Sequence, residues 1–120
     1  MGKLNHLQIA VKDCRASRDW YIEHMGMKLE FEARRRRVAG LQDDLGITLI
    51  LEQVEGEIDP GSCILAFEVD DVEAKYEELF ANGVRFVHAP KKVWGYGAEL
   101  KDPNGYRVRL WDERTMNEKG

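Results

Sequence analysis

Seven side chains in the sequence have the chemistry to hold a small organic ligand: His6, Gln8, Thr48, Glu52, Trp94, Arg109 and Trp111. Imidazole, amide, hydroxyl and carboxylate groups offer hydrogen bonds, a guanidinium pairs with an anion, and indoles stack on planar rings. A few polar groups among apolar neighbours are typical of a ligand pocket. The same mixture is found in subunit interfaces, where Trp and Arg are enriched, and the simplest alternative is a solvated sheet face.

Motifs for other kinds of chemistry are missing. The sequence contains no GxSxG, no P-loop and no GxGxxG. Its two cysteines, Cys14 and Cys63, have no CxxC spacing and no recognisable nucleophile context. We expect both to be buried free thiols.

A repeat in the sequence predicts which elements position the seven residues. The alternating series Leu7, Ile9, Val11, Asp13 returns after a shift of 58 as Leu65, Phe67, Val69, Asp71. Residues 43–51 match residues 102–110 after a shift of 59. Two copies are too few for a solenoid, so we interpret the chain as a duplicated module with halves of about 1–56 and 62–115. The Gly- and Pro-containing segment 56–62 is the predicted linker.

The sequence pattern of each half predicts a strand, then a helix, then three further strands. The predicted strands are 5–11, 27–32, 37–41 and 47–53, then 63–69, 84–88, 96–101 and 106–112. The predicted helices are 15–24 and 72–81. Asp13 and Asp71 (or Asp70) stand at the N-cap positions, and Gly26 and Gly83 at the C-terminal ends.

Alternation divides each strand between two faces. One face is apolar, as in Leu7, Ile9 and Val11 or in Tyr106, Val108 and Leu110, and is expected to pack under the helices. The other face is mixed and carries six of the seven candidate residues, while Trp94 comes just before a strand.

This duplicated unit resembles the vicinal oxygen chelate superfamily, which includes glyoxalase I, fosfomycin- and bleomycin-resistance proteins and extradiol dioxygenases. The resemblance covers nearly the whole chain and is carried by residues 6–13, 17–21, 67–72 and 94–105, above all by Trp94-Gly95 before a strand and Asp102-Pro103-Asn104-Gly105 after it. It implies one α+β domain over 1–120, in which two tandem βαβββ modules form an eight-stranded curved sheet with an inner cup. It also implies a homodimer.

The resemblance implies a divalent metal site at four inner-face positions, which this sequence fills with His6, Ile50, Ile64 and Arg109. Only His6 offers a suitable donor, because isoleucine has none and a guanidinium is a permanent cation. We therefore predict no metal cofactor. The alternative is a site rearranged around His6 with Glu52 or Glu68.

Charge and hydropathy exclude several partners. The chain has 18 basic and 22 acidic residues, which argues against nucleic acid, and no apolar run long enough to span a membrane. Its first residues lack an apolar signal region, so a cytoplasmic protein is expected. The run Arg34–Arg37 is expected to be a solvated loop, or alternatively to attract an anionic ligand over the cup. Arg109 needs a partner, either Glu52 or an anionic group of a ligand.

The leading hypothesis is a small-molecule binding protein of the glyoxalase/bleomycin-resistance type that sequesters a drug or metabolite, with an anionic or aromatic ligand. One alternative is a metal-dependent lyase, isomerase or dioxygenase that uses His6 and rearranged carboxylates. Another is a dimeric interaction module.

Overall fold

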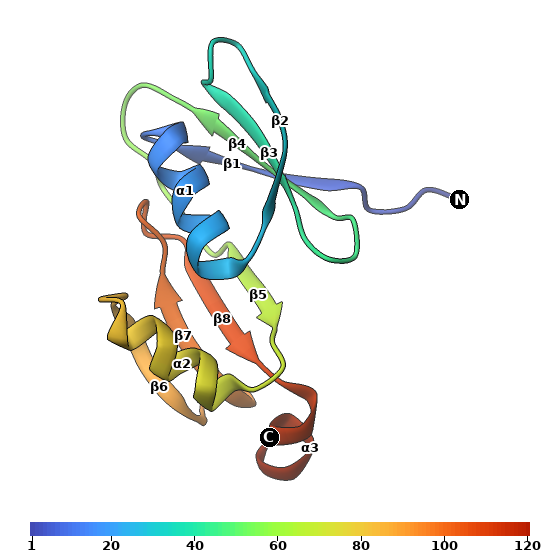
Figure 1. The fold of residues 1–120 in the computed structure, drawn as a ribbon, viewed down its shortest axis with the longest axis vertical. Helices are drawn as coiled ribbons and strands as arrows, with labels where there is room; N and C mark the ends of the chain where they lie inside the picture. The colour runs from blue at the N-terminus through green and yellow to red at the C-terminus, as the bar shows by residue number, and fades with distance from the viewer. The chain divides into compact units, whose positions relative to one another are not determined.

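A computed structural model describes residues 1–120, which form two compact units, Met1–Asp59 and Pro60–Gly120. Each unit contains a four-stranded sheet with a helix against it (Figure 1). The boundary between the units falls inside the predicted linker 56–62.

The first unit follows the predicted βαβββ order. Its elements are β1 (His6–Val11), α1 (Cys14–Met25), β2 (Lys28–Ala33), β3 (Val38–Gln42) and β4 (Thr48–Gln53). The strand order is β1-β4-β3-β2. β1 and β4 are parallel, and the remaining pairs are antiparallel.

The second unit repeats this topology and adds a terminal helix. Its elements are β5 (Ile64–Glu68), α2 (Val72–Ala81), β6 (Phe86–Lys92), β7 (Tyr96–Lys101), β8 (Arg107–Trp111) and α3 (Glu113–Lys119). The strand order β5-β8-β7-β6 matches that of the first unit. The α+β fold of two tandem βαβββ modules is thus confirmed, with the eight strands divided equally between two sheets.

Both helices begin beside the predicted N-caps, and α1 ends at the predicted Gly26, whereas the C-cap of α2 is Asn82 rather than Gly83. Asp13 and Asp71 adopt extended backbone conformations, and their carboxylates accept hydrogen bonds from the N–H groups of Ala16 and Ala74, both at 3.1 Å. Asp71, rather than Asp70, is therefore the N-cap of α2. Gly26 ends α1 in the left-handed region at φ 68°, which a residue with a Cβ rarely adopts.

The predicted apolar faces form most of the core. In the first unit the core includes Ile9, Val11, Leu49 and Leu51, and in the second it includes Leu65, Tyr106, Val108 and Leu110. Leu7 is 44% exposed, although its register partner on β4, Leu49, is buried. Phe80 is 63% exposed near the C-terminal end of α2.

Helices α1 and α2 each begin with the same kind of hydrogen bond, from a backbone N–H at the start of the helix to a side chain at the end of the last strand in the unit. In the first unit the N–H of Cys14 donates to Oε1 of Gln53 at 3.0 Å. In the second, the N–H of Val72 donates to Oδ2 of Asp112 at 2.7 Å. Each acceptor thus satisfies one of the N–H groups that a helix leaves unpaired at its N-terminus.

The cysteines differ in burial. Cys14 is buried, and burial raises the pKa of its thiol, whereas Cys63 is half-buried in the turn before β5. No helix in the structure is both long and apolar enough to cross a membrane.

Candidate ligand-binding site

The seven predicted site residues fall into two groups. His6 and Gln8 lie on β1 and Thr48 and Glu52 on β4, all in the first unit. In the second unit, Trp94 lies between β6 and β7, and Arg109 and Trp111 lie on β8.

The polar groups of the first unit are largely engaged with one another. Nε2 of Gln8 donates to Glu52 at 3.2 Å, and Arg34 pairs with the other oxygen of Glu52 at 3.2 Å. Thr48 is only 5% exposed and its hydroxyl donates to Glu30 at 2.7 Å. His6 is exposed, as Gln8 is, and its Nδ1 lies 3.3 Å from Oδ1 of Asn5.

Arg109 is paired within its own sheet. Its Nε donates to Oε1 of Glu99 on β7 at 3.0 Å, and Glu99 lies directly opposite Arg109 in the strand register. Arg107 makes two hydrogen bonds to the same carboxylate, both at 3.1 Å. The prediction that Glu52 is the protein partner of Arg109 is therefore wrong, because the cross-strand position belongs to Glu99.

Glu99 is 5% exposed, and its ionised form is stabilised by the arrangement. The hydrogen bond from Arg107 lowers the pKa of Glu99 most, Arg109 lowers it further, and burial opposes both. These three residues form the arginine–glutamate cluster, which carries a net charge of one positive unit. Sequence reasoning missed Glu99, although the turn at residues 103–104, within the Asp102-Pro103-Asn104-Gly105 motif, sets a register that pairs residues 99 and 109.

Trp94 holds Arg109 from the ring side. The guanidinium carbon of Arg109 lies 4.6 Å from the ring centroid of Trp94, a cation–π contact. The indole N–H of Trp94 donates to Nε2 of His88 at 3.2 Å, while Nδ1 of His88 lies 2.8 Å from the carbonyl of Ala89. A neutral imidazole protonated on Nδ1 satisfies both contacts. His88 thus helps to hold the indole ring of Trp94 in place.

The rest of this sheet face is open and partly apolar. Arg109 pairs in register with Ala66 on β5, Arg107 with Ile64, and Trp111 with Glu68. Cross-strand partners point to the same side of a sheet. We call this surface the Arg109 face; it comprises Ile64, Ala66, Glu68, Trp94, Glu99, Lys101, Arg107, Arg109 and Trp111.

Gly97 provides the space in which Trp94 lies. A Cβ at this position would overlap the indole ring of Trp94 and the backbone carbonyl oxygen of Leu110. Gly40 of the first unit lies under a ring in the same way, but the three atoms nearest to its Cβ would all belong to the side chain of Phe31.

We expect Gly97→Ala to lower the free energy of unfolding by about 1–3 kcal/mol, because a backbone atom must move to make room. Gly40→Ala is the matched control, and its loss is expected to be smaller, since a side chain can rotate away. Urea denaturation measures both losses, and the indole N–H resonance of Trp94 is expected to shift only in Gly97→Ala. Equal stability of Gly97→Ala and the wild type would contradict the expectation.

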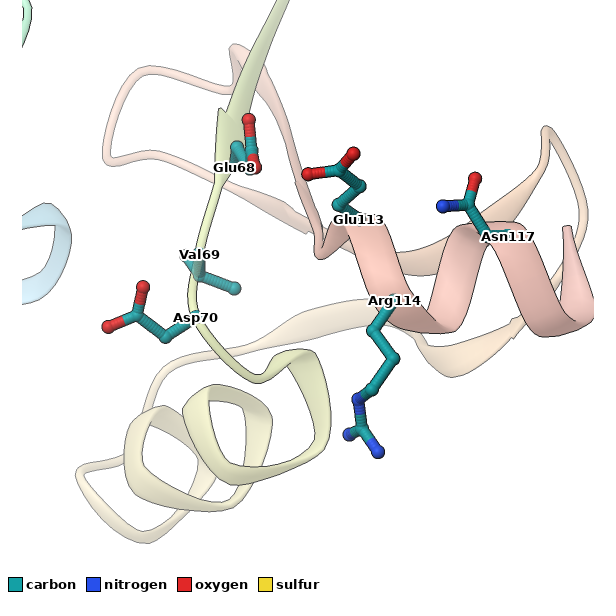
Figure 2. A pocket seen from close by; sticks show the side chains of 6 residues that line it. All are labelled: Glu68, Val69, Asp70, Glu113, Arg114 and Asn117. Carbon is teal, nitrogen blue, oxygen red and sulfur yellow. The ribbon is translucent and has the colours of Figure 1, made fainter.

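A separate hollow lies where β5 gives way to α2, next to the start of α3 (Figure 2). Its lining comprises Glu68, Val69, Asp70, Glu113, Arg114 and Asn117. Three carboxylates against one guanidinium give it a negative charge, in contrast to the arginine–glutamate cluster. None of the seven predicted site residues lines it.

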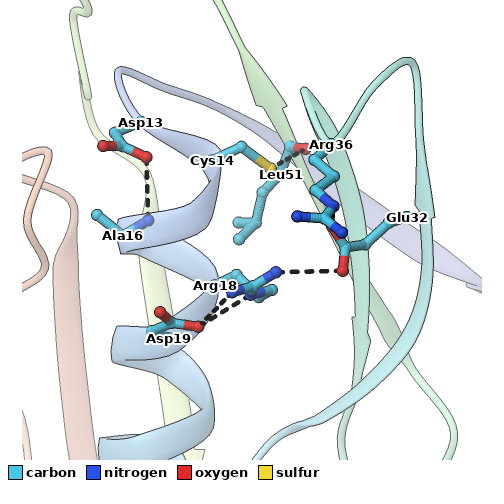
Figure 3. Close-up of polar contacts among 8 residues, drawn as sticks. All are labelled: Asp13, Cys14, Ala16, Arg18, Asp19, Glu32, Arg36 and Leu51. Atoms are coloured by element: carbon cyan, nitrogen blue, oxygen red, sulfur yellow. Dashed lines mark hydrogen bonds and ion pairs between the residues drawn. The ribbon is translucent and has the colours of Figure 1, made fainter.

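The arginine run forms the turn between β2 and β3. The backbone φ values of Arg34, Arg35 and Arg36 are 50°, 56° and 66°. Residues other than glycine rarely adopt this left-handed conformation. Arg34 pairs with Glu52, Arg37 with Glu55 at 3.2 Å, and Arg36 with Glu32 at 4.0 Å (the last beside Arg18 in Figure 3). Glutamates thus offset part of the positive charge in this turn, and Glu32 is shared with Arg18 at 3.1 Å.

The residues at the four positions implied for a metal do not form a ligand set. Ile50 and Ile64 have no donor atoms, and Arg109 is committed to Glu99 as a cation. The structure has no group of three or more His, Cys, Asp or Glu side chains that could hold a metal ion.

The sequence and the fold together define the class of protein. The model of the Glyoxalase/Bleomycin resistance protein/Dioxygenase superfamily matches residues 3–110. The chain therefore belongs to this superfamily. No curated protein is similar enough in sequence to count as a match.

Several solved structures share the fold. A glyoxalase/dioxygenase from Nostoc punctiforme has 22% identity and a TM-score of 0.79, with 92% of this chain and 90% of that chain covered. A possible glyoxalase from Bacillus cereus has 20% identity and a TM-score of 0.78, with 92% and 98% covered. TnmS3, an antibiotic binding protein from Streptomyces sp. CB03234, has 26% identity and a TM-score of 0.76, with 93% and 96% covered.

Proposed function

We propose that this protein binds a small organic molecule through the Arg109 face, without the divalent metal of its superfamily. The observation that carries the proposal is the placement of Arg109. Its guanidinium is held between the Trp94 ring and Glu99, yet its side chain remains 21% exposed. A charged side chain fixed on two sides and open on a third is preorganised for a ligand.

The surroundings of Arg109 support binding rather than metal chemistry. Ala66 and Ile64 give the face an apolar floor, and Trp111 adds a half-buried ring. Apolar walls with a few fixed polar groups are typical of small-molecule sites. The similarity to TnmS3, an antibiotic binding protein, is in keeping with sequestration of a drug or metabolite. We further propose that the protein is a homodimer.

Thermal-shift screening of a library of metabolites and antibiotics tests the proposal. A ligand present at about 100 times its dissociation constant adds about 2.7 kcal/mol of stability, which gives a clear rise in Tm. Trp94→Leu is expected to abolish the rise. Trp20→Phe is the control and is expected to keep it, because Trp20 packs on Tyr21 in helix α1.

Elemental analysis distinguishes this proposal from the enzymatic alternative. Protein purified without a tag is expected to contain no stoichiometric Ni, Zn, Mn or Fe. One equivalent of such a metal, lost in His6→Ala, would overturn the metal-free proposal in favour of a metal-dependent enzyme.

A further inference from the structure

We infer that the Arg109 face selects a ligand with a planar group and a single negative charge, typically an aromatic carboxylate. This inference rests on the proposed function and names the chemical class of its ligand. It depends on three observations: the unused nitrogens of Arg109, the charge of the arginine–glutamate cluster, and the occupied ring of Trp94.

The terminal nitrogens of Arg109 are available to a ligand. The hydrogen bond to Glu99 uses Nε, and neither Nη1 nor Nη2 donates to any protein group. Every buried side-chain nitrogen and oxygen in the structure has a partner, so these two nitrogens reach solvent. A guanidinium presents its N–H groups as a planar fork that fits the two oxygens of a carboxylate.

The charge of the cluster indicates a monoanion. Arg107 and Arg109 contribute two positive charges and Glu99 one negative charge. The exposed side chains of Glu68 on β5 and Lys101 on β7 lie on the same side of the sheet and add one charge of each sign, so the sum is unchanged. One bound carboxylate therefore neutralises the cluster, and the partly buried setting strengthens this attraction relative to water.

A cationic ligand is disfavoured by the same geometry. Aromatic rings attract cations, and Trp94 would be the natural platform for one. Its ring is already in contact with the guanidinium of Arg109, at 4.6 Å from the centroid. A ligand cation would have to displace Arg109 and would meet the uncompensated positive charge of the cluster.

The neighbours of Arg109 favour a flat group next to the carboxylate. Ala66, its register partner on β5, has a small exposed side chain, so a ring can lie over the strand at this point. Trp111 follows on the same side of β8, two residues along, and offers an aromatic edge.

Three nearly isosteric probes test the inference: benzoate, benzamide and benzamidine, with charges of −1, 0 and +1. Each is titrated into the full chain while the indole N–H resonance of Trp94 is followed by NMR, assigned with Trp94→Phe. We expect benzoate to bind most tightly, benzamide more weakly and benzamidine least. The affinity for benzoate is also expected to fall with added salt.

Arg109→Met is expected to weaken benzoate binding by about tenfold or more, the effect of losing hydrogen bonds to a charged group. This variant should fold, because Glu99 keeps both hydrogen bonds to Arg107. Circular dichroism and Tm check the fold. Arg109→Lys keeps the charge but not the fork, so an intermediate affinity is expected. Arg15→Met, an equal charge change on helix α1, is the control and is expected to leave benzoate binding unchanged.

The outcomes separate this inference from the proposed function. If benzamide binds as tightly as benzoate, or if benzamidine binds best, the anion preference is overturned while ligand binding stands. If a library compound binds through Trp94 but none of the three probes does, the inferred class is wrong. If neither probes nor library compounds bind, both proposals fail.

Discussion

Replacing Glu99 with glutamine is expected to lower the free energy of unfolding by about 2–4 kcal/mol at pH 7, because it leaves two partly buried guanidiniums without a counter-charge. Arg107 and Arg109 lie two residues apart on one face of β8, and both donate to this carboxylate. The amide keeps the shape of Glu99 but carries no charge. Urea denaturation followed by tryptophan fluorescence measures the loss.

Glu68→Gln is the matched control for this variant. Glu68 is an exposed glutamate on β5, on the same side of the sheet, opposite Trp111. Its substitution is expected to change stability by no more than about 0.5 kcal/mol. Similar losses in Glu68→Gln and Glu99→Gln would show that the cluster does not stabilise the fold.

The pH dependence of the Glu99 variant follows from the lowered pKa of that carboxyl. The hydrogen bond from Arg107 is the main cause, Arg109 adds to it, and burial opposes both. A folded pKa below the unfolded value of about 4.3 means that the stabilisation is fully present above that value. It is lost as the pH falls through the folded pKa. The difference in stability between wild type and Glu99→Gln is thus expected to be constant near neutral pH and to shrink in acid.

The duplicated fold could be predicted because its signals are local and occur twice. Asp13 and Asp71 cap helices whose polar and apolar residues repeat at helical spacing, and Gly26 ends the first of them at a positive φ. Alternation over β1 and β8 assigned Ile9, Val11, Val108 and Leu110 to the core correctly. Each of these signals needs only residues close in the chain.

Two elements were missed or shifted because their local signals are weak. Helix α3 buries only Thr115, so its sequence shows no apolar stripe. β6 runs over Phe86–Lys92 rather than the predicted 84–88. Pro90 lies within β6, where the pairing with β7 shifts register. A strand tolerates proline at such an irregularity, because proline has no N–H to donate to the neighbouring strand.

The candidate site could be predicted in part. Trp94 and Arg109 were both expected to contribute, and the structure places the ring of one under the guanidinium of the other. The partner of Arg109 was not found, because a pairing between strands depends on register rather than on sequence distance. His88 was missed for a related reason: its hydrogen bond to Trp94 depends on the path of the chain between β6 and β7.

Replacing Asp112 with alanine is expected to lower the free energy of unfolding by about 2–4 kcal/mol, since one buried carboxylate serves two helices. Asp112 is 1% exposed. Its Oδ2 accepts the N–H of Val72 at the start of α2, and its Oδ1 accepts the N–H of Thr115 in α3 at 2.6 Å. Alanine would leave both N–H groups without these partners. Thermal and urea denaturation measure the loss.

The acid sensitivity of this contact gives a second readout. Burial opposes ionisation of Asp112, but the hydrogen bonds from Val72 and Thr115 outweigh it and lower the pKa of the carboxyl. The Asp112 carboxylate therefore stabilises the fold fully at pH values above its unfolded-state pKa of about 3.9. This stabilisation is lost as the pH falls through the folded-state pKa. The difference in free energy of unfolding between wild type and Asp112→Ala is expected to become smaller in acid.

Two matched variants separate the contact made by Asp112 from ordinary helix capping. Asp71→Ala removes an exposed cap from α2 alone, and Gln53→Ala removes the equivalent hydrogen bond to Cys14 in the first unit. Each is expected to cost about 1 kcal/mol, because each removes a single hydrogen bond. A loss in Asp112→Ala no larger than these would show that its two hydrogen bonds are replaced by water. A larger loss would show that the carboxylate of Asp112, which caps α3 and also accepts from α2, stabilises the second unit more than Gln53 stabilises the first.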